Sequence, residues 1–211
     1  MVAIIDDLSK LNPQRRAGVA MLRTLPQNSV CAEIGVYRGA FSRIIMDVVN
    51  PKSLYLIDPW QWKKQWYVKH SVEELESMRT GENTPEGDSL YEAVAKLFRN
   101  KPEVKILRAP SVEASAQFQN AHFDWIFIDG DHRYEPCRDD IRHWWPKLKL
   151  GGFICGDDYL RAEAPRRQDK FMVNNGVHFA VDEFVLENKL KIELFPWEGD
   201  GRANYSVQKP R

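Results

Sequence analysis

Cysteine is scarce in this sequence, and neither sign of charge is in excess. The three cysteines, Cys31, Cys137 and Cys155, include no C-x-x-C pair, so neither a zinc site nor a disulfide framework is indicated. The 30 basic and 30 acidic residues cancel to a net charge of zero. A basic surface of the kind that binds nucleic acid is therefore not expected.

Long apolar runs are also absent. No stretch approaches the roughly 18 consecutive apolar residues of a membrane helix, and Asp6 and Asp7 occupy the place where a secretory signal would be basic. We therefore predict a cytoplasmic protein with neither a membrane nor a nucleic-acid partner. At 211 residues the chain suits a single domain, 1–211, and the formation of a homo-oligomer stays open.

The most informative stretch of the sequence is a glycine-containing turn near residue 35. An apolar run at 30–34 predicts a strand, Gly35 and Gly39 bracket a turn, and helical spacing follows over 41–49. This order makes a ligand cradle, because the backbone N–H groups point outward and glycine permits close approach. Glu33 replaces the first glycine of a dinucleotide motif, and its carboxylate suits an ammonium group better than a pyrophosphate.

The pattern E-x-G-x-x-x-G resembles the first motif of class I methyltransferases, which use S-adenosylmethionine. The resemblance implies that this cofactor is bound by Glu33, Gly35, Tyr37, Gly39 and Ser42. An ordinary strand-to-helix turn is the alternative, because short glycine motifs often match by chance.

Three further residues are candidates for holding the cofactor. Asp58 ends an apolar run at 53–57, about 20 residues after the glycine turn, where an acid can accept from both ribose hydroxyls; a helix cap is the alternative. Trp60 could stack on adenine, or its ring could pack into the core. Ser111 is placed to cap a helix after a strand at 104–108 and to meet the adenine edge.

Residues 60–89 are aromatic at the start and rich in turn residues at the end. A long loop in this position predicts a lid over the site. Packing against the core or against a second subunit is the alternative.

Acidic residues follow two further apolar runs. The run 125–128 leads to Asp129, Asp131 and His132, and the next leads to Asp157 and Asp158. Because ligands bind beyond the carboxyl ends of parallel strands, Asp129, Asp157 and Asp158 should converge. Oxygen ligands of this kind favour Mg²⁺ first, then Ca²⁺ or Mn²⁺. Alternatively, Asp157 caps a helix and Asp158 pairs with Arg161 or Arg166.

The tracts I-D-G-D-H-R-Y-E and L-G-G-F-I-C-G-D-D-Y, together with G-V-H-F-A-V-D-E-F at 176–184, resemble the macrocin O-methyltransferase group. The resemblance implies that Asp129, Asp157 and Asp158 bind magnesium and that Asp131 is a general base, with His132 as the other candidate. It also implies a Rossmann-like three-layer α/β sandwich whose mostly parallel seven-stranded sheet ends in an antiparallel strand.

The sequence thus predicts an S-adenosylmethionine-dependent, Mg-assisted O-methyltransferase acting on a hydroxyl of a small molecule, a sugar or another natural product. Two alternatives stay open. One is a metal-independent methyltransferase on nitrogen, protein or nucleic acid, although the Pro-Pro-aromatic tract of the amine-modifying enzymes is missing after Ile128. The other is a non-catalytic binding module with this fold.

Overall fold

The computed structural model describes residues 8–61, 85–161, 176–199 and 201–211. Its strands are β1 (Val30–Ile34), β2 (Ser53–Ile57), β3 (Val104–Leu107), β4 (Phe123–Ile128), β5 (Leu148–Leu160), β6 (Ile192–Pro196) and β7 (Arg202–Gln208). Its helices are α1 (Pro13–Leu22), α2 (Ala40–Val49), α4 (Pro85–Phe98), α5 (Ser111–Ser115), α6 (Tyr134–Trp144) and α7 (Val177–Glu187). Short 3₁₀ helices lie at Leu8–Lys10 and Trp145–Lys147.

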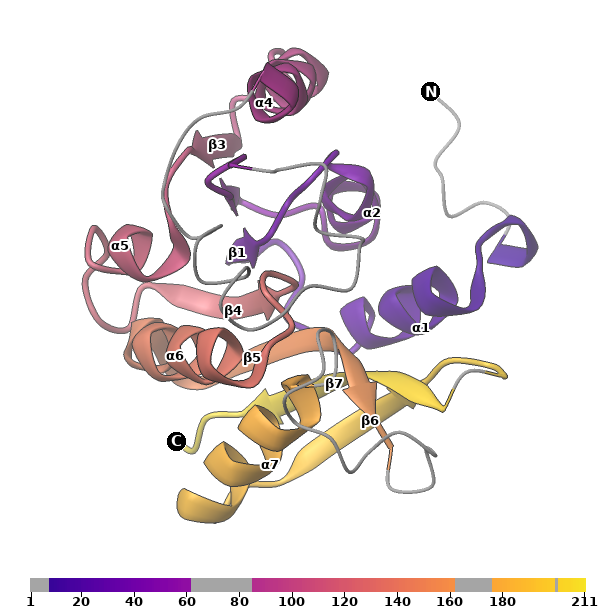
Figure 1. Cartoon of the computed structure of the whole chain (residues 1–211), viewed down its shortest axis with the longest axis vertical. Coiled ribbons are helices and arrows are strands. Elements are labelled where there is room, and N and C mark those ends of the chain that lie inside the picture. Colours follow the sequence, from indigo (N-terminus) through magenta and orange to yellow (C-terminus); the bar gives the residue numbers. More distant parts are fainter. Residues whose placement is uncertain (1–7, 62–84, 162–175, 200) are drawn as a thin grey trace.

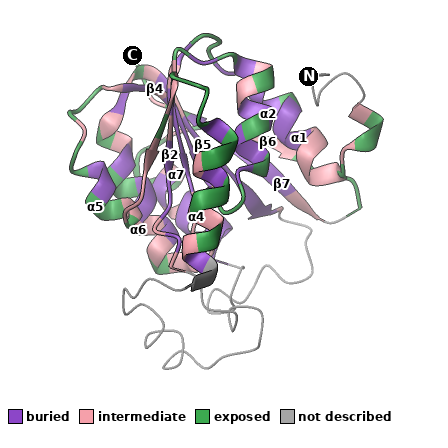
Figure 2. Cartoon of the chain, turned by 90° about the horizontal axis from the view of Figure 1, so that it is seen from above, coloured by how far each residue is buried: buried purple, intermediate pink, exposed green. Residues whose placement is uncertain are grey.

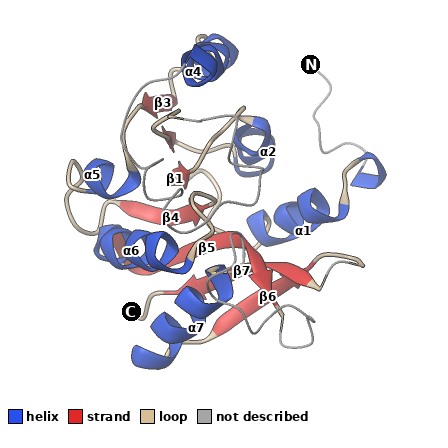
Figure 3. Ribbon diagram, in the orientation of Figure 1, coloured by secondary structure: helices blue, strands red, loops and turns tan. Residues whose placement is uncertain are grey.

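All seven strands join one sheet in the order β3-β2-β1-β4-β5-β7-β6. Strands β1 to β5 pair in parallel with one another, and β7 runs antiparallel to both of its neighbours, β5 and β6. Helices α1, α2 and α4 lie on one side of the sheet and α5, α6 and α7 on the other (Figures 1 and 3). The predicted fold class is confirmed.

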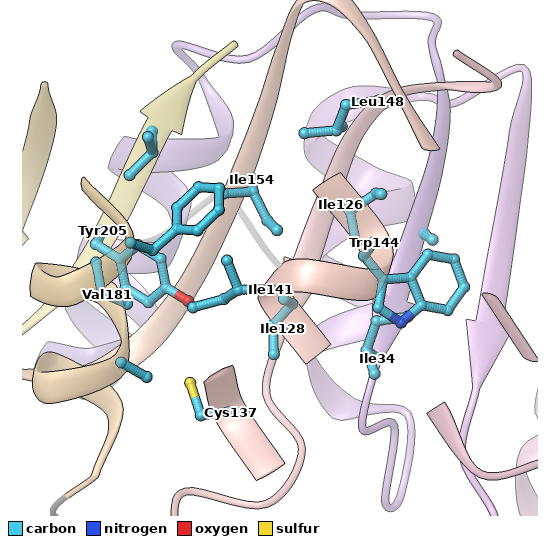
Figure 4. Packing of buried hydrophobic residues seen from close by; sticks show 14 of the residues in the cluster. Ile34, Ile126, Ile128, Cys137, Ile141, Trp144, Leu148, Ile154, Val181 and Tyr205 are labelled. Atoms are coloured by element: carbon cyan, nitrogen blue, oxygen red, sulfur yellow. The ribbon is translucent and has the colours of Figure 1, made fainter. Parts of the chain in front are cut away.

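Two apolar clusters, one on each face of the sheet, hold these layers together. The first packs Trp144 and Ile141 of α6 and Val181 of α7 against β4 and β5 (Figure 4). The second packs Leu22 of α1 and Ile45 of α2 against the opposite face. Buried residues fill the central strands throughout (Figure 2), as expected for parallel strands covered on both faces.

The bounds of several elements differ from the sequence-based expectation. Helix α4 begins at Pro85, within the stretch 60–89 that was expected to be a long loop, because proline is well suited to the first turn of a helix. Helix α5 begins at Ser111, and its N-cap is Pro110, which makes no side-chain hydrogen bond to the helix. The prediction that Ser111 is the cap was therefore wrong.

Within the described residues, no helix is long and apolar enough to cross a membrane. Most of the predicted lid, residues 62–84, lies outside the described part of the chain.

Candidate functional site

The glycine turn lies directly against the end of β4. Gly35 has φ of +86°, and a Cβ there would lie 2.0 Å from the carbonyl oxygen of Asp129. The backbone N–H of Asp129 in turn donates to the carbonyl of Ile34 at 2.7 Å. Gly39 has φ of +70° and is the N-cap of α2. Only glycine provides both the space and the left-handed conformation that the turn needs at position 35.

Glu33, on β1, points into the protein beneath this turn. It is buried, and the Ser42 hydroxyl on α2 donates to its carboxylate. Burial raises the pKa of Glu33 to about 8, against the opposing effects of the Ser42 hydrogen bond and the Arg15 charge. The acid and the serine predicted to bind the cofactor thus lie together and bond to each other.

Asp58, at the end of β2, fastens the turn from the other side. Its Oδ2 accepts from the N–H groups of Val36 and Tyr37, both at 2.9 Å, and its Oδ1 accepts from the N–H of Trp60 at 2.6 Å. Burial raises the pKa of Asp58, and these three backbone hydrogen bonds oppose that shift. Both acceptor positions of Oδ2 are thus used and one of Oδ1 remains, so one hydroxyl group could still bind here.

Trp60 and Ser111 are both directed into the protein. The Trp60 ring is completely buried, and its Nε1 donates to the carbonyl of Tyr37 at 2.9 Å. The Ser111 hydroxyl accepts from Nε1 of Trp144 at 2.8 Å and hydrogen-bonds the buried Asp140 carboxyl on α6. The Trp60 ring therefore offers no free face to adenine, whereas the Ser111 hydroxyl is half-buried and already has two partners. Trp60 supports the glycine turn, and Ser111 joins α5 to α6.

The two acids of β5 were expected at the end of the strand, but they lie at an irregularity inside it. The pairing of β5 with β7 shifts register between Gly156 and Tyr159, and Asp158 has φ of +54°. In a regular strand, consecutive side chains point to opposite faces. The bulge removes this alternation, so that Asp157 and Asp158 can both reach one cluster.

Four side chains meet in that cluster, which we call the acidic cluster: Asp129, His132, Asp157 and Asp158. Each offers one ligand atom, and these atoms all lie within 4.8 Å of one another. The convergence expected of the three carboxylates is present. The His132 imidazole also lies among them.

His132 lies between two carboxylates of the acidic cluster. Its Nε2 is 3.1 Å from Oδ1 of Asp129, and its Nδ1 is 3.4 Å from Oδ2 of Asp158. Burial lowers the pKa of His132, but the hydrogen bond to Asp129 and the surrounding negative charges outweigh it and raise the pKa to about 10. The His132 carbonyl also accepts from the N–H of Gly176 at 2.9 Å, which fixes the start of α7 beside the cluster.

Asp131 points to a different partner. Its carboxylate receives the Arg133 guanidinium, with Nε 2.9 Å from Oδ1 and 3.0 Å from Oδ2. The Arg133 backbone N–H also donates to Oδ1 at 3.0 Å. Asp131 therefore lies beside the acidic cluster as one half of an ion pair.

Two residues that the sequence reasoning missed hold the acids of β5. Nε2 of Gln14, on α1, donates to Oδ2 of Asp157 at 2.8 Å. Nη1 of Arg202, on β7, lies 2.9 Å from Oδ1 of Asp158. No local sequence pattern links these residues to the acids, because only the packing of α1 and β7 brings them together. Asp158 pairs with an arginine, as the alternative reading expected, although with Arg202.

The acidic cluster has the chemistry of a cation site. Asp157 is 3% exposed, and its Oδ1 has no hydrogen-bond partner among the described residues. Burial and the neighbouring charge of Asp129 raise the pKa of Asp157 to about 8. Buried carboxylates so close together need a shared proton or a cation. Three carboxylates suit Mg²⁺, Mn²⁺ or Ca²⁺.

Residues 32–159 match the family model described as a methyltransferase domain. A curated protein of Acanthamoeba polyphaga mimivirus, described as uncharacterized, is 44% identical over 36 residues, which is 17% of this chain and 16% of the viral protein.

Solved structures share the fold at low identity. Didemethyltoxoflavin methyltransferase of Burkholderia thailandensis, with didemethyltoxoflavin and S-adenosylhomocysteine bound, has a TM-score of 0.59 and 14% identity, over 98% of this chain and 82% of that one. Aeropyrum pernix fibrillarin, with S-adenosylmethionine natively bound, has a TM-score of 0.57 and 11% identity, over 90% and 72% of the two chains.

Proposed function

The chain belongs to the methyltransferase-domain family, and from that premise we propose that it transfers a methyl group from S-adenosylmethionine to a hydroxyl group of a small molecule. The enzyme class follows from the family, and the acceptor and the cation are our proposal. A sugar or another natural product is the acceptor class that the resemblance to the macrocin O-methyltransferase group implies.

One observation carries the proposal: Asp129 belongs to the glycine turn and to the acidic cluster at the same time. Its backbone forms the wall against which Gly35 packs, and its side chain is one of the four groups of the cluster. A donor bound at the turn and a hydroxyl bound at the cluster would therefore be neighbours. Holding the two reactants together in line can contribute roughly 7 to 11 kcal/mol to lowering the barrier.

The residues of the turn suit the two ends of the donor. Glu33 supplies an acid below the turn for the ammonium group, through the polar network that it forms with Ser42. Asp58 supplies a carboxylate at the end of β2 for the ribose hydroxyls. Because Asp58 also holds the N–H groups of Val36 and Tyr37, the same side chain would shape the turn and bind the cofactor.

The hydroxyl group must lose its proton as the oxygen attacks the methyl carbon. A cation held by Asp129, Asp157 and Asp158 would supply Lewis-acid stabilisation of the developing oxyanion. We assign the proton to Asp131, because both ring nitrogens of His132 already face carboxylates of the acidic cluster, Nε2 at 3.1 Å from Asp129 and Nδ1 at 3.4 Å from Asp158. The ion pair with Arg133 would hold the Asp131 carboxylate in a fixed orientation.

A metal-independent methyltransferase is the second candidate. The ion pair between Arg202 and Asp158 favours it, because a guanidinium already offsets part of the negative charge of the acidic cluster. The first candidate requires neither nucleic acid nor a membrane as a partner, and we place the protein in the cytoplasm.

The test is a transfer assay with S-adenosylmethionine labelled in its methyl group and a panel of sugar and phenolic hydroxyl acceptors, with and without a chelator. Label in an O-methyl product that falls on chelation and returns with Mg²⁺ or Mn²⁺ is the expected result. Transfer that a chelator leaves intact would support the second candidate. Asp157→Asn should reproduce the effect of the chelator, and label appearing on an amine instead would contradict the hydroxyl assignment.

A further inference from the structure

We propose that Gln14, in the first turn of α1, is a positioning residue for the cation site. Its side-chain amide holds one oxygen of Asp157 and leaves the other for the ion. The inference rests on the proposed function only in requiring that the acidic cluster binds a cation. It makes the helix before β1 part of the active site, although the family match begins at residue 32.

The contact between Gln14 and Asp157 is specific. Nε2 of Gln14 donates to Oδ2 of Asp157 at 2.8 Å across 143 residues of sequence. Because a carboxylate only accepts hydrogen bonds, the donor must be the nitrogen of the amide, and this fixes the orientation of the Gln14 side chain. Oδ1 of Asp157 is left buried without a hydrogen-bond partner in the described part of the chain.

Helix α1 does not need the Gln14 side chain for its own formation. Asn12 is the N-cap and accepts from the N–H of Arg15 at 2.8 Å, and Pro13 occupies the first helical position. These are favourable choices for the start of a helix. The Gln14 amide is therefore available for a distant partner, and in this fold that partner is Asp157.

A neutral amide suits the holding of a cation ligand. An unheld Asp157 carboxyl could rotate away from the position in which its ligand atom lies within 4.8 Å of the other ligand atoms of the acidic cluster. A cationic partner would prevent this rotation, but it would also compete with the ion for the carboxylate, as Arg202 does at Asp158. Gln14 restrains the carboxylate through a neutral amide and adds no positive charge beside the ion.

Partners that orient metal ligands typically change metal affinity by about 10- to 100-fold when they are removed. We therefore expect Gln14→Leu to weaken Mn²⁺ binding to the full-length protein by about 10-fold or more, measured by calorimetric titration. The affinity of the Gln14→Leu variant for S-adenosylmethionine, measured without the ion, should stay within about twofold of that of the unmodified protein, because the residues of the glycine turn are unchanged. Gln14→Ala, which lacks the bulk of leucine, should give the same result.

Arg16 provides a matched control on the same helix. Its guanidinium binds Glu198 in the turn between β6 and β7, at 2.5 Å, and the carbonyl of Leu11, so it also fastens α1 but does not reach the acidic cluster. Arg16→Ala should leave Mn²⁺ affinity unchanged. An equal loss of affinity in Arg16→Ala would mean that docking of α1 matters, rather than the amide of Gln14, and would overturn the inference.

Two further outcomes also decide whether the inference about Gln14 holds. If the unmodified protein binds both Mn²⁺ and S-adenosylmethionine, and both Gln14 variants bind Mn²⁺ equally well, the inference fails and the proposed function stands. If the unmodified protein binds S-adenosylmethionine but not Mn²⁺, the cation part of the proposed function fails and the inference fails with it. Thermal unfolding of each variant shows that the measurement was made on folded protein.

Discussion

The contact between the glycine turn and β4 can be tested by comparing Gly35 with Gly199, a second glycine with a positive φ. Gly35 and Gly199 have nearly the same φ, +86° and +82°. A Cβ at Gly35 would lie 2.0 Å from the carbonyl oxygen of Asp129, whereas a Cβ at Gly199 would meet nothing within 4 Å. An alanine at each position therefore separates the conformational cost from the steric cost.

The size of both effects can be estimated. A residue with a Cβ in the left-handed region costs about 1–2 kcal/mol, and this is the whole effect expected for Gly199→Ala. At Gly35 the backbone of β4 must also move, and forcing extra volume into a packed interior costs typically about 1–3 kcal/mol. Gly35→Ala should therefore lower the free energy of unfolding by about 2–5 kcal/mol in total.

Thermal or urea unfolding measures the difference between the two variants directly. For a protein of this size, each kcal/mol lowers the unfolding midpoint by about 2–4 °C. Gly35→Ala should also weaken S-adenosylmethionine binding, because the turn and the end of β4 would move apart, whereas Gly199→Ala should not. Equal destabilisation by the two substitutions, with cofactor binding retained in both, would refute the contact between the turn and Asp129.

Three further substitutions test other parts of the site. The folded-state pKa of Glu33 is raised to about 8, so its contribution to stability is complete below its unfolded pKa and is lost as the pH rises through 8. Glu33→Gln should flatten this part of the plot of stability against pH. An unchanged plot would contradict the argument that burial raises the pKa of Glu33. Asp131→Asn should reduce kcat by at least about 100-fold with little change in cofactor affinity, and an equal loss of both would exclude Asp131 as the base. Trp60→Phe removes the hydrogen bond from Trp60 to the Tyr37 carbonyl and should lower the free energy of unfolding by about 1–3 kcal/mol. Unchanged stability together with weaker cofactor binding would instead favour stacking of Trp60 on adenine.

The central strands were predictable because their physical signal is local. Parallel strands buried on both faces are continuous apolar runs, and the observed bounds of β1 match the predicted run at 30–34. The acids that follow such runs could be assigned to one edge of the sheet before any coordinates were known. The approach of Asp129 to the acids of β5 was expected from this topology, whereas the bulge that lets both Asp157 and Asp158 reach the cluster was not.

Other features of the site depend on packing that leaves no local pattern. Whether the Trp60 ring faces a ligand or the core is decided by its fit against the Tyr37 carbonyl and the Tyr91 ring, and both directions suit the same sequence. The bulge at Asp157 and Asp158 depends on how β5 pairs with β7, a strand more than 40 residues further along the chain.

The acidic cluster shows why the sequence identified its carboxylates but not the groups that hold them. A carboxylate buried beside two others is unfavourable unless its charge is offset, so three converging acids indicate a ligand wherever they occur. A holding group needs only one N–H in the right place, and many residues can provide that. Gln14 and Arg202 reach Asp157 and Asp158 because β7 pairs with β5 and α1 packs against β7, and this arrangement is a property of the whole sheet. The acids could therefore be identified from the sequence by residue type, whereas the residues that hold them could be identified only from the structure.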